Sequence, residues 1–308
     1  MQINQLLRTR KYSKNVAWQA TLINEQGYAI MLENLCFRRH VMHITLTGNL
    51  GSGKSTICKL LQNDYGFEIF STGKVQRKLA EEMNLTVLEM NQLMCSDSKY
   101  DSMIDDATTR LAKENQDKNI VFDSRLAWHF VESSFKVFLM VSLDVAANRV
   151  MNDSRGAVES YKDFEDAKDQ LAKRAANEDA RYKDLYNIEY FNFNNYNLVL
   201  DSTYATPESL AKVIMEEAKK YEEAKKAGQV EPRTKILVSP KRLFACDEIT
   251  EHDKELLKEV VENYKERGTY IQDAIKAKKD GDIFSALERE NEVKAMILAE
   301  TTFVPISL

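Results

Sequence analysis

The strongest constraint on this chain is a glycine-rich segment, Gly48-Asn49-Leu50-Gly51-Ser52-Gly53-Lys54-Ser55, which lies between two regular elements. Residues 43–47 before it form an apolar, β-branched run typical of a strand, and residues 54–62 after it have apolar side chains on one helical face. A glycine-rich loop in this position points successive backbone N–H groups at one place, and the helix N-terminus adds partial positive charge. The segment therefore predicts a phosphate-binding P-loop, since its context argues against a chance match.

The polar side chains of this loop have expected tasks. Lys54 should reach the β- and γ-phosphates of a nucleoside triphosphate, and the Ser55 hydroxyl should ligate Mg²⁺. Thr56 lies behind them and is expected at the α-phosphate. The predicted triphosphate-binding residues are Gly48, Asn49, Leu50, Gly51, Ser52, Gly53, Lys54, Ser55 and Thr56.

Strand and helix patterns alternate after the loop. Strands are expected at residues 68–71, 120–122, 137–143 and 198–200, and helices at 101–114, from Asp144 onward, and at 206–226. This alternation is typical of a three-layer α/β fold with a parallel sheet. Residues 160–187 are nearly all charged or polar, so they form either a solvated helix or a helical lid over a nucleotide site.

Composition narrows the class of ligand. The net charge of −5 argues against general nucleic-acid binding, which needs a basic face. No apolar run approaches the roughly 20 residues of a membrane span. The four cysteines are far apart and form no metal-ligand pair, which fits reduced thiols in a cytoplasmic protein. We therefore expect a small-molecule nucleotide ligand, with no nucleic acid and no membrane.

Two further segments suggest where a second phosphate could bind. Thr72 and Gly73 follow directly on the strand at 68–71, and Arg77 lies one helical turn later. The free N–H groups of this turn and the Arg77 guanidinium could together bind a phosphate. The alternative is a plain N-cap with a solvated Arg77. Asp123 ends the strand at 120–122 and could orient Mg²⁺-bound water, while Arg125 could pair bidentately with the acceptor phosphate.

Charged residues at helical spacing complete the candidate site. Arg174, Glu178 and Arg181 stand at i, i+4 and i+7, so one helix face carries them and both guanidiniums can converge on one place. Asp101 and Asp105, at i and i+4, could accept hydrogen bonds from an exocyclic amine such as that of cytosine. An exposed acidic helix face is the alternative for this pair.

Several of these stretches resemble the cytidylate kinase-like family in its archaeal-type form. Residues 71–77 look like the acceptor-binding strand–turn–helix of nucleoside monophosphate kinases, and residues 99–105 look like the short acidic element of that family. Residues 121–128 are similar to its strand ending in Gly-Arg-Leu-Ala, and residues 174–186 resemble its lid. The motifs keep the order of the family over about residues 42–226.

The resemblance implies ATP- and Mg²⁺-dependent phosphoryl transfer to a nucleoside monophosphate, with CMP or dCMP first. The residues it implies for catalysis are Lys54, Arg125, Arg174 and Arg181, with Ser55 as the metal ligand. Those it implies for substrate binding are Thr72, Gly73, Arg77, Asp101, Asp105, Asp123, Arg125 and Glu178.

Two departures from the family pattern keep other functions open. Ser124 stands where the family usually has glycine, and Asp153 falls where the first lid arginine is expected, with Arg155 two residues later. Both suggest an altered acceptor or reduced activity. A kinase of another small molecule and a non-catalytic nucleotide sensor acting through its C-terminal segment therefore remain alternatives.

The two ends of the chain differ from its middle. Residues 1–41 carry six Lys or Arg against two acids, a net charge of +4, and the whole-chain charge of −5 leaves −9 for the rest. We expect 1–41 to be a basic, poorly ordered extension and the functional chain to begin near Met42. The expected domains are a nucleotide kinase domain at 42–228 and a small α+β domain at 235–308, joined by a linker at 229–234. In the small domain we expect strands at 236–238 and near 282–286, a helix at 254–267, and a final helix and strand.

The C-terminal segment weakly resembles a degenerate ParB/sulfiredoxin-like domain, through residues 238–243 at its start and 293–306 at its end. Where that family binds nucleotide phosphate, this chain reads Arg289-Glu290-Asn291-Glu292. Two carboxylates there disfavour an anionic ligand. Docking, dimerisation or binding of a protein partner is one interpretation of the segment, and a structural appendage is the other.

Overall fold

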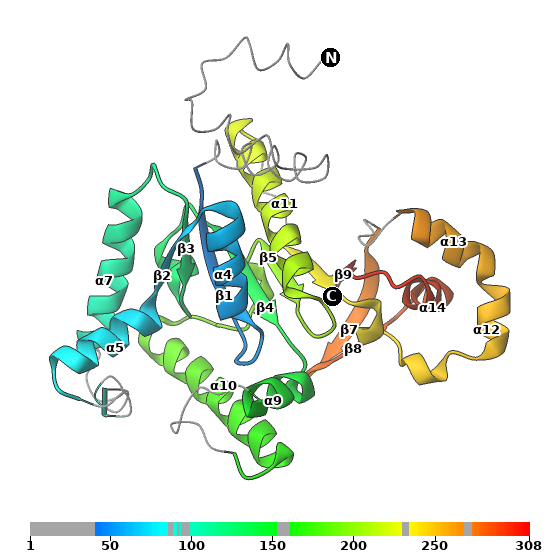
Figure 1. The fold of residues 1–308 in the computed structure, drawn as a ribbon, viewed down its shortest axis with the longest axis horizontal. Coiled ribbons are helices and arrows are strands. Elements are labelled where there is room, and N and C mark those ends of the chain that lie inside the picture. Colours follow the sequence, from blue (N-terminus) through cyan, green and yellow to red (C-terminus); the bar gives the residue numbers. More distant parts are fainter. Residues whose placement is uncertain are drawn as a thin grey trace, which may run out of the picture. The chain divides into compact units, whose positions relative to one another are not determined.

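Nine strands among the described residues form a sheet in the order β2-β3-β1-β4-β5-β6-β9-β7-β8 (Figure 1). The computed structural model describes residues 41–85, 89–90, 93, 99–152, 161–229, 234–267 and 273–308, without the side chains of 77–79. Residues 42–308 make one compact unit. The expected extension (apart from Val41), most of the expected linker, and residues Asp153 and Arg155 lie outside the described part of the chain.

The first five strands are parallel neighbours. They are β1 (His43–Gly48), β2 (Glu68–Ser71), β3 (Ile120–Asp123), β4 (Phe135–Met140) and β5 (Leu198–Asp201). Most of their apolar side chains are fully buried, as expected of parallel strands that are covered on both faces.

The helices of this region are α4 (Lys54–Tyr65), α5 (Thr72–Glu82), α7 (Lys99–Glu114), α8 (Ala127–Phe130), α9 (Leu143–Asn152), α10 (Phe164–Tyr186) and α11 (Pro207–Lys226). Helices α4 and α11 pack on each other and on the parallel strands, and α9 packs on α10 (Figure 1). The expected α/β fold with a mostly parallel sheet is thus confirmed. In the described part of the chain, no helix is both long enough and apolar enough to cross a bilayer.

Strand order brings the predicted site residues to one edge of the sheet. Strands β1 and β2 flank β3, and the register pairs Leu46 and Ser71 with Asp123. Because the carboxyl ends of parallel strands lie at the same edge, the loop after β1, the turn after β2 and Asp123 must be neighbours. The site is therefore assembled from segments that are distant in sequence.

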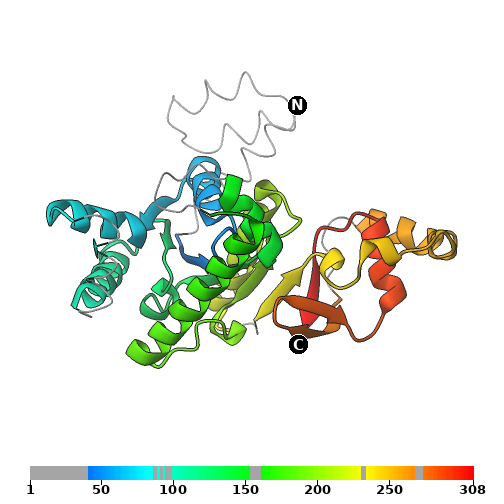
Figure 2. The same cartoon turned by 90° about the horizontal axis from the view of Figure 1, so that it is seen from below.

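Residues 235–308 continue the same sheet. Strand β6 (Lys235–Val238) pairs in parallel with β5, and β9 (Val304–Ser307), β7 (Ile275–Asp280) and β8 (Ile283–Ala286) follow in that order. Beside them lie α12 (Glu251–Leu256), α13 (Lys258–Arg267) and α14 (Glu290–Leu298) (Figure 2). The segment mixes helices and strands, and its status as a separate domain stays a prediction.

Two elements of this segment differ from the sequence-based expectation. A single helix was expected at 254–267, but two helices meet at Leu257, and the first begins earlier because Thr250 and Asp253 form a capping box. Strand β7 was missed. Its lysines are exposed while Ile275 and Ala277 are buried, so its apolar signal is reduced to two side chains.

We predict that removal of 235–308 destabilises the rest of the chain. One hydrophobic cluster contains Phe138, Val199, Ile236, Val293 and Ile306, so truncation uncovers side chains that are now buried. Loss of a single large buried side chain costs about 2–5 kcal/mol, and truncation removes several. Urea unfolding of residues 42–228 should therefore give a lower midpoint than that of 42–308. Equal midpoints would indicate an independent C-terminal domain.

Candidate active site

The glycine-rich loop follows β1 and opens α4, and two of its positions require glycine. At Gly48, with φ of +142°, a Cβ atom would lie 2.1 Å from the carbonyl oxygen of Leu139 on β4. At Gly51, with φ of +75°, it would lie 2.8 Å from the Cα of Ala146 on α9. The loop is thus held close to β4 and α9, with a backbone that side chains disfavour.

Two cationic side chains meet at one backbone oxygen of this loop. The Nζ of Lys54 donates to the carbonyl oxygens of Gly48 at 2.9 Å and Asn49 at 3.1 Å. The Nη1 of Arg125 donates to the same Gly48 oxygen. Burial, followed by the nearby Arg125 charge, lowers the pKa of Lys54 to about 7, although Asp123 and Glu178 act in the opposite direction.

Glu178 on α10 balances part of this positive charge. Its carboxylate lies 3.1 Å from the Nε of Arg125 and 3.4 Å from the Nε of Arg174. Arg174 stands one turn before Glu178 on the same helix, with 48% of its side chain exposed. The carboxylate therefore connects the end of β3 to the helix expected as a lid, which we call the lid helix.

The carboxylates of α7 also have partners on the lid helix. Arg181 forms an ion pair with Asp101, and the hydroxyl of Tyr186 donates to Asp105 at 2.6 Å. Burial, together with the charges of Asp101 and Asp106, raises the pKa of Asp105 to about 6, against the opposing hydrogen bond from Tyr186. Neither carboxylate belongs to the exposed acidic helix face that was the alternative reading.

One cavity of about 470 Å³ brings most of the predicted residues together. The residues that line it and were predicted from the sequence to belong to the site are Leu50, Gly51, Ser52, Gly53, Lys54, Ser55, Thr72, Gly73, Asp101, Asp105, Asp123, Arg125, Arg174, Glu178 and Arg181. Ser124 lines it too, and Asp123 accepts a hydrogen bond from the Ser71 hydroxyl at 3.2 Å. Arg77 lies on α5, but its side chain is outside the described part of the structure.

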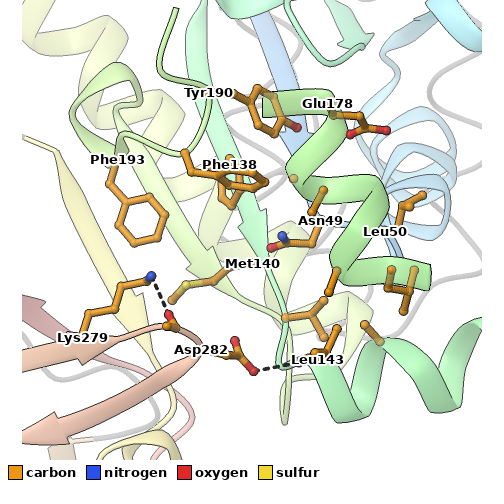
Figure 3. A pocket seen from close by; sticks show the side chains of 18 of the residues that line it. Asn49, Leu50, Phe138, Met140, Leu143, Glu178, Tyr190, Phe193, Lys279 and Asp282 are labelled. Carbon is orange, nitrogen blue, oxygen red and sulfur yellow. Dashed lines mark hydrogen bonds between the residues drawn. The ribbon is translucent and has the colours of Figure 1, made fainter. Parts of the chain in front are cut away.

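Three predicted residues face neighbouring cavities instead. Thr56 lines a cavity of about 590 Å³ on the α9 side of the loop, together with Gly51 and Arg149. Gly48 and Asn49 line an apolar cavity of about 250 Å³. Glu178 and Tyr190 lie at one end of this apolar cavity, and Lys279 and Asp282 lie at the other (Figure 3).

Two residues at the site were not predicted from the sequence. Tyr182 lines the main cavity, and its spacing of four residues from both Glu178 and Tyr186 is a helical-face signal that could have revealed it. Arg149 on α9 donates to the carbonyl oxygens of Gly51 at 3.1 Å and Ser202 at 2.7 Å. No local pattern marks Arg149, because both of its partners are distant in sequence.

A P-loop that faces arginines on a polar helix, across one cavity, has the arrangement expected of a P-loop phosphotransferase. The family model of the cytidylate kinase-like family matches residues 43–204. The chain belongs to this family, and the resemblance seen in its motifs is confirmed.

Two relatives have comparable similarity over nearly their whole length. The cytidylate kinase of Methanobrevibacter smithii is 33% identical over 174 residues, which cover 56% of this chain and 96% of that protein. The cytidylate kinase of Haloarcula marismortui is 34% identical over 182 residues, which cover 58% of this chain and 91% of that protein. Among solved structures, the shikimate kinase of Bacteroides thetaiotaomicron is 17% identical over 57% of this chain and 97% of its own, and its TM-score of 0.42 adds nothing to the fold assignment.

We predict that triphosphate binding takes up a proton above neutral pH. With a pKa of about 7, Lys54 is mostly neutral at pH 8 in the free protein. A polyphosphate favours the charged ammonium, so it raises this pKa, and affinity should fall by up to about tenfold per pH unit above 7. Calorimetric titration with ATP at pH 8, in two buffers of different ionisation enthalpy, should detect uptake approaching one proton. The Lys54→Arg variant is the control, because arginine does not titrate in this range. Zero uptake by the unaltered chain would contradict the prediction.

Proposed function

We propose that this protein transfers the γ-phosphoryl group of ATP to a nucleoside monophosphate, with CMP or dCMP as the first acceptor to test. The observation that carries the proposal is the single cavity in which the loop residues face the carboxylates of α7 and the arginines of the lid helix. Phosphoryl transfer needs positioning and positive charge around the moving group rather than a covalent residue. The names of the curated relatives support cytosine as the base of the acceptor.

On the donor side, the backbone N–H groups of the loop and the ammonium of Lys54 would hold the β- and γ-phosphates. Thr56 lies toward the cavity it shares with Arg149 and Pro207, which has room for the nucleoside of ATP. Arg149 would hold the loop in shape there, since it donates to Gly51.

Mg²⁺ is the expected metal, and the available oxygen atoms suit it. The Ser55 hydroxyl and the Asp123 carboxylate line the same cavity, and Mg²⁺ usually combines one or two such ligands with water and substrate phosphates. In the described part of the chain, no cluster of three or more His, Cys, Asp or Glu residues could hold a metal by itself. The ion would bring charge that balances the phosphates.

On the acceptor side, Arg125 would bind the acceptor phosphate, with Thr72, Gly73 and Arg77 expected near it. Asp101 and Asp105 would accept hydrogen bonds from the base. Arg181 pairs with Asp101, and Glu178 pairs with Arg125, so substrate would exchange these partners. Arg174 and Arg181 would then turn to the transferring group, while the lid helix excludes water.

The alternatives differ in what they predict for the same assay. Ser124, at a position where the family usually has glycine, lines the cavity. Its larger side chain is the observation that favours a different small-molecule acceptor. A nucleotide sensor would bind ATP tightly without turnover and use 235–308 to contact a partner. Mg²⁺, the absence of nucleic-acid binding and a cytoplasmic location likewise stay predictions.

The decisive assay is transfer from Mg-ATP to a panel of common monophosphates by the full chain. We predict that CMP or dCMP gives the highest kcat/KM and that Lys54→Ala lowers it by at least about 100-fold, as loss of one charge-stabilising donor does. Lys212→Ala is the matched control, because that lysine lies on α11 with 72% of its side chain exposed. ATP binding without transfer to any monophosphate would rule out this proposal.

A further inference from the structure

Asp282 in the β7–β8 turn reaches the helix that supports the P-loop. Its Oδ2 accepts a hydrogen bond at 2.8 Å from the backbone N–H of Leu143, the first residue of α9 (Figure 3). The preceding N–H, that of Ser142, donates to the hydroxyl of Thr203 at 3.0 Å. Helix α9 therefore has its first N–H groups held by two side chains from other segments, and a carboxylate there also complements the helix dipole.

Arg242 holds Asp282 in this position. Its Nη2 donates to the carbonyl oxygen of Asp282 at 2.7 Å and to the Oδ1 of the same residue at 3.1 Å. The guanidinium lies 5.4 Å from the ring centre of Phe284 on β8. Only 10% of the Arg242 side chain is exposed, whereas 44% of the Asp282 side chain is, so the arginine is fixed by its surroundings and the carboxylate lies at the surface.

The other side of Arg242 faces the end of β5. Its Nε lies 3.7 Å from Asp201, which is fully buried. Asp201 accepts hydrogen bonds from the N–H and hydroxyl of Thr203, the residue whose hydroxyl holds Ser142. A buried arginine thus joins the β7–β8 turn to the segment that leads into α11, with its charge balanced on both sides.

Helix α9 transmits this position to the loop by direct contact. Ala146 lies so close to Gly51 that a Cβ atom on Gly51 would come within 2.8 Å of it. Three residues further on, Arg149 donates to the Gly51 carbonyl at 3.1 Å. Any displacement of the start of α9 would therefore move the backbone that the triphosphate is expected to contact.

Arg242 and Asp282 lie in a part of the chain outside the family match, which ends at residue 204. The alignment of 174 residues with the Methanobrevibacter smithii relative covers 96% of that protein, which leaves it no length for an equivalent of 235–308.

We propose that Asp282 and Arg242 are positioning residues for ATP, through which 235–308 sets the conformation of the P-loop. Neither residue lines the main cavity, and both would act through α9 on Gly51. The proposal rests on the phosphotransferase function above, but the binding of ADP reports on it without any turnover.

The test compares Asp282→Ala with Asp282→Asn and with Asp280→Ala in the full chain. Asp280 is an exposed residue at the end of β7, just before the same turn, and serves as the matched control. Asp282→Ala should raise the KM for ATP and the Kd for Mg-ADP by about tenfold, while the KM for the acceptor changes less than about twofold. Asp282→Asn keeps an oxygen acceptor for the Leu143 N–H and should recover most of the ATP affinity. Asp280→Ala should match the unaltered chain.

Two results would overturn the proposal. One is an unchanged Kd for Mg-ADP in Asp282→Ala, whether or not the thermal midpoint falls, and the other is an equal rise in the KM of both substrates. If the unaltered chain transfers no phosphoryl group, the proposed function fails, and calorimetric titration with Mg-ADP still decides between Asp282→Ala and its controls.

Discussion

The carbonyl oxygen of Gly48 accepts hydrogen bonds from both Lys54 and Arg125, and this meeting of two cations governs the site. Like charges at such a distance repel, and burial removes the water that would screen them. The lowered pKa of Lys54 is one consequence, and the ion pair between Arg125 and Glu178 is another. A bound polyphosphate would relieve the same repulsion and favour the charged form of Lys54.

The carboxylates of the site explain how so many cations coexist in it. Glu178 lies between Arg125 and Arg174, and Asp101 holds Arg181. Each of these pairs joins the lid helix to another element, or stabilises it internally. Substrate would then compete with carboxylates for the arginines, which couples binding to movement of the lid helix.

Most of the kinase region could be predicted from the sequence, because its signals are local. The loop 48–55 is bounded by a strand and a helix, and Arg174, Glu178 and Arg181 share a helix face by spacing alone. The partners of these residues could not be predicted in the same way. That Glu178 pairs with Arg125, and Arg181 with Asp101, depends on how the lid helix packs across the ends of the strands. Strand β7 and the role of Asp282 could not be predicted either. A lysine-rich strand and a single carboxylate in a turn have no distinctive sequence pattern.

The residues expected to bind ATP and those expected to bind the monophosphate meet at one cavity. A single ligand that spans both groups of residues tests this arrangement most directly. Adenosine and cytidine joined through their 5′ oxygens by five phosphates should bind in the presence of Mg²⁺ at least about 100-fold more tightly than ATP or CMP alone, because the second half binds at high effective concentration. Calorimetric titration of the full chain gives the three dissociation constants. Binding of the joined compound no tighter than that of ATP would contradict the account.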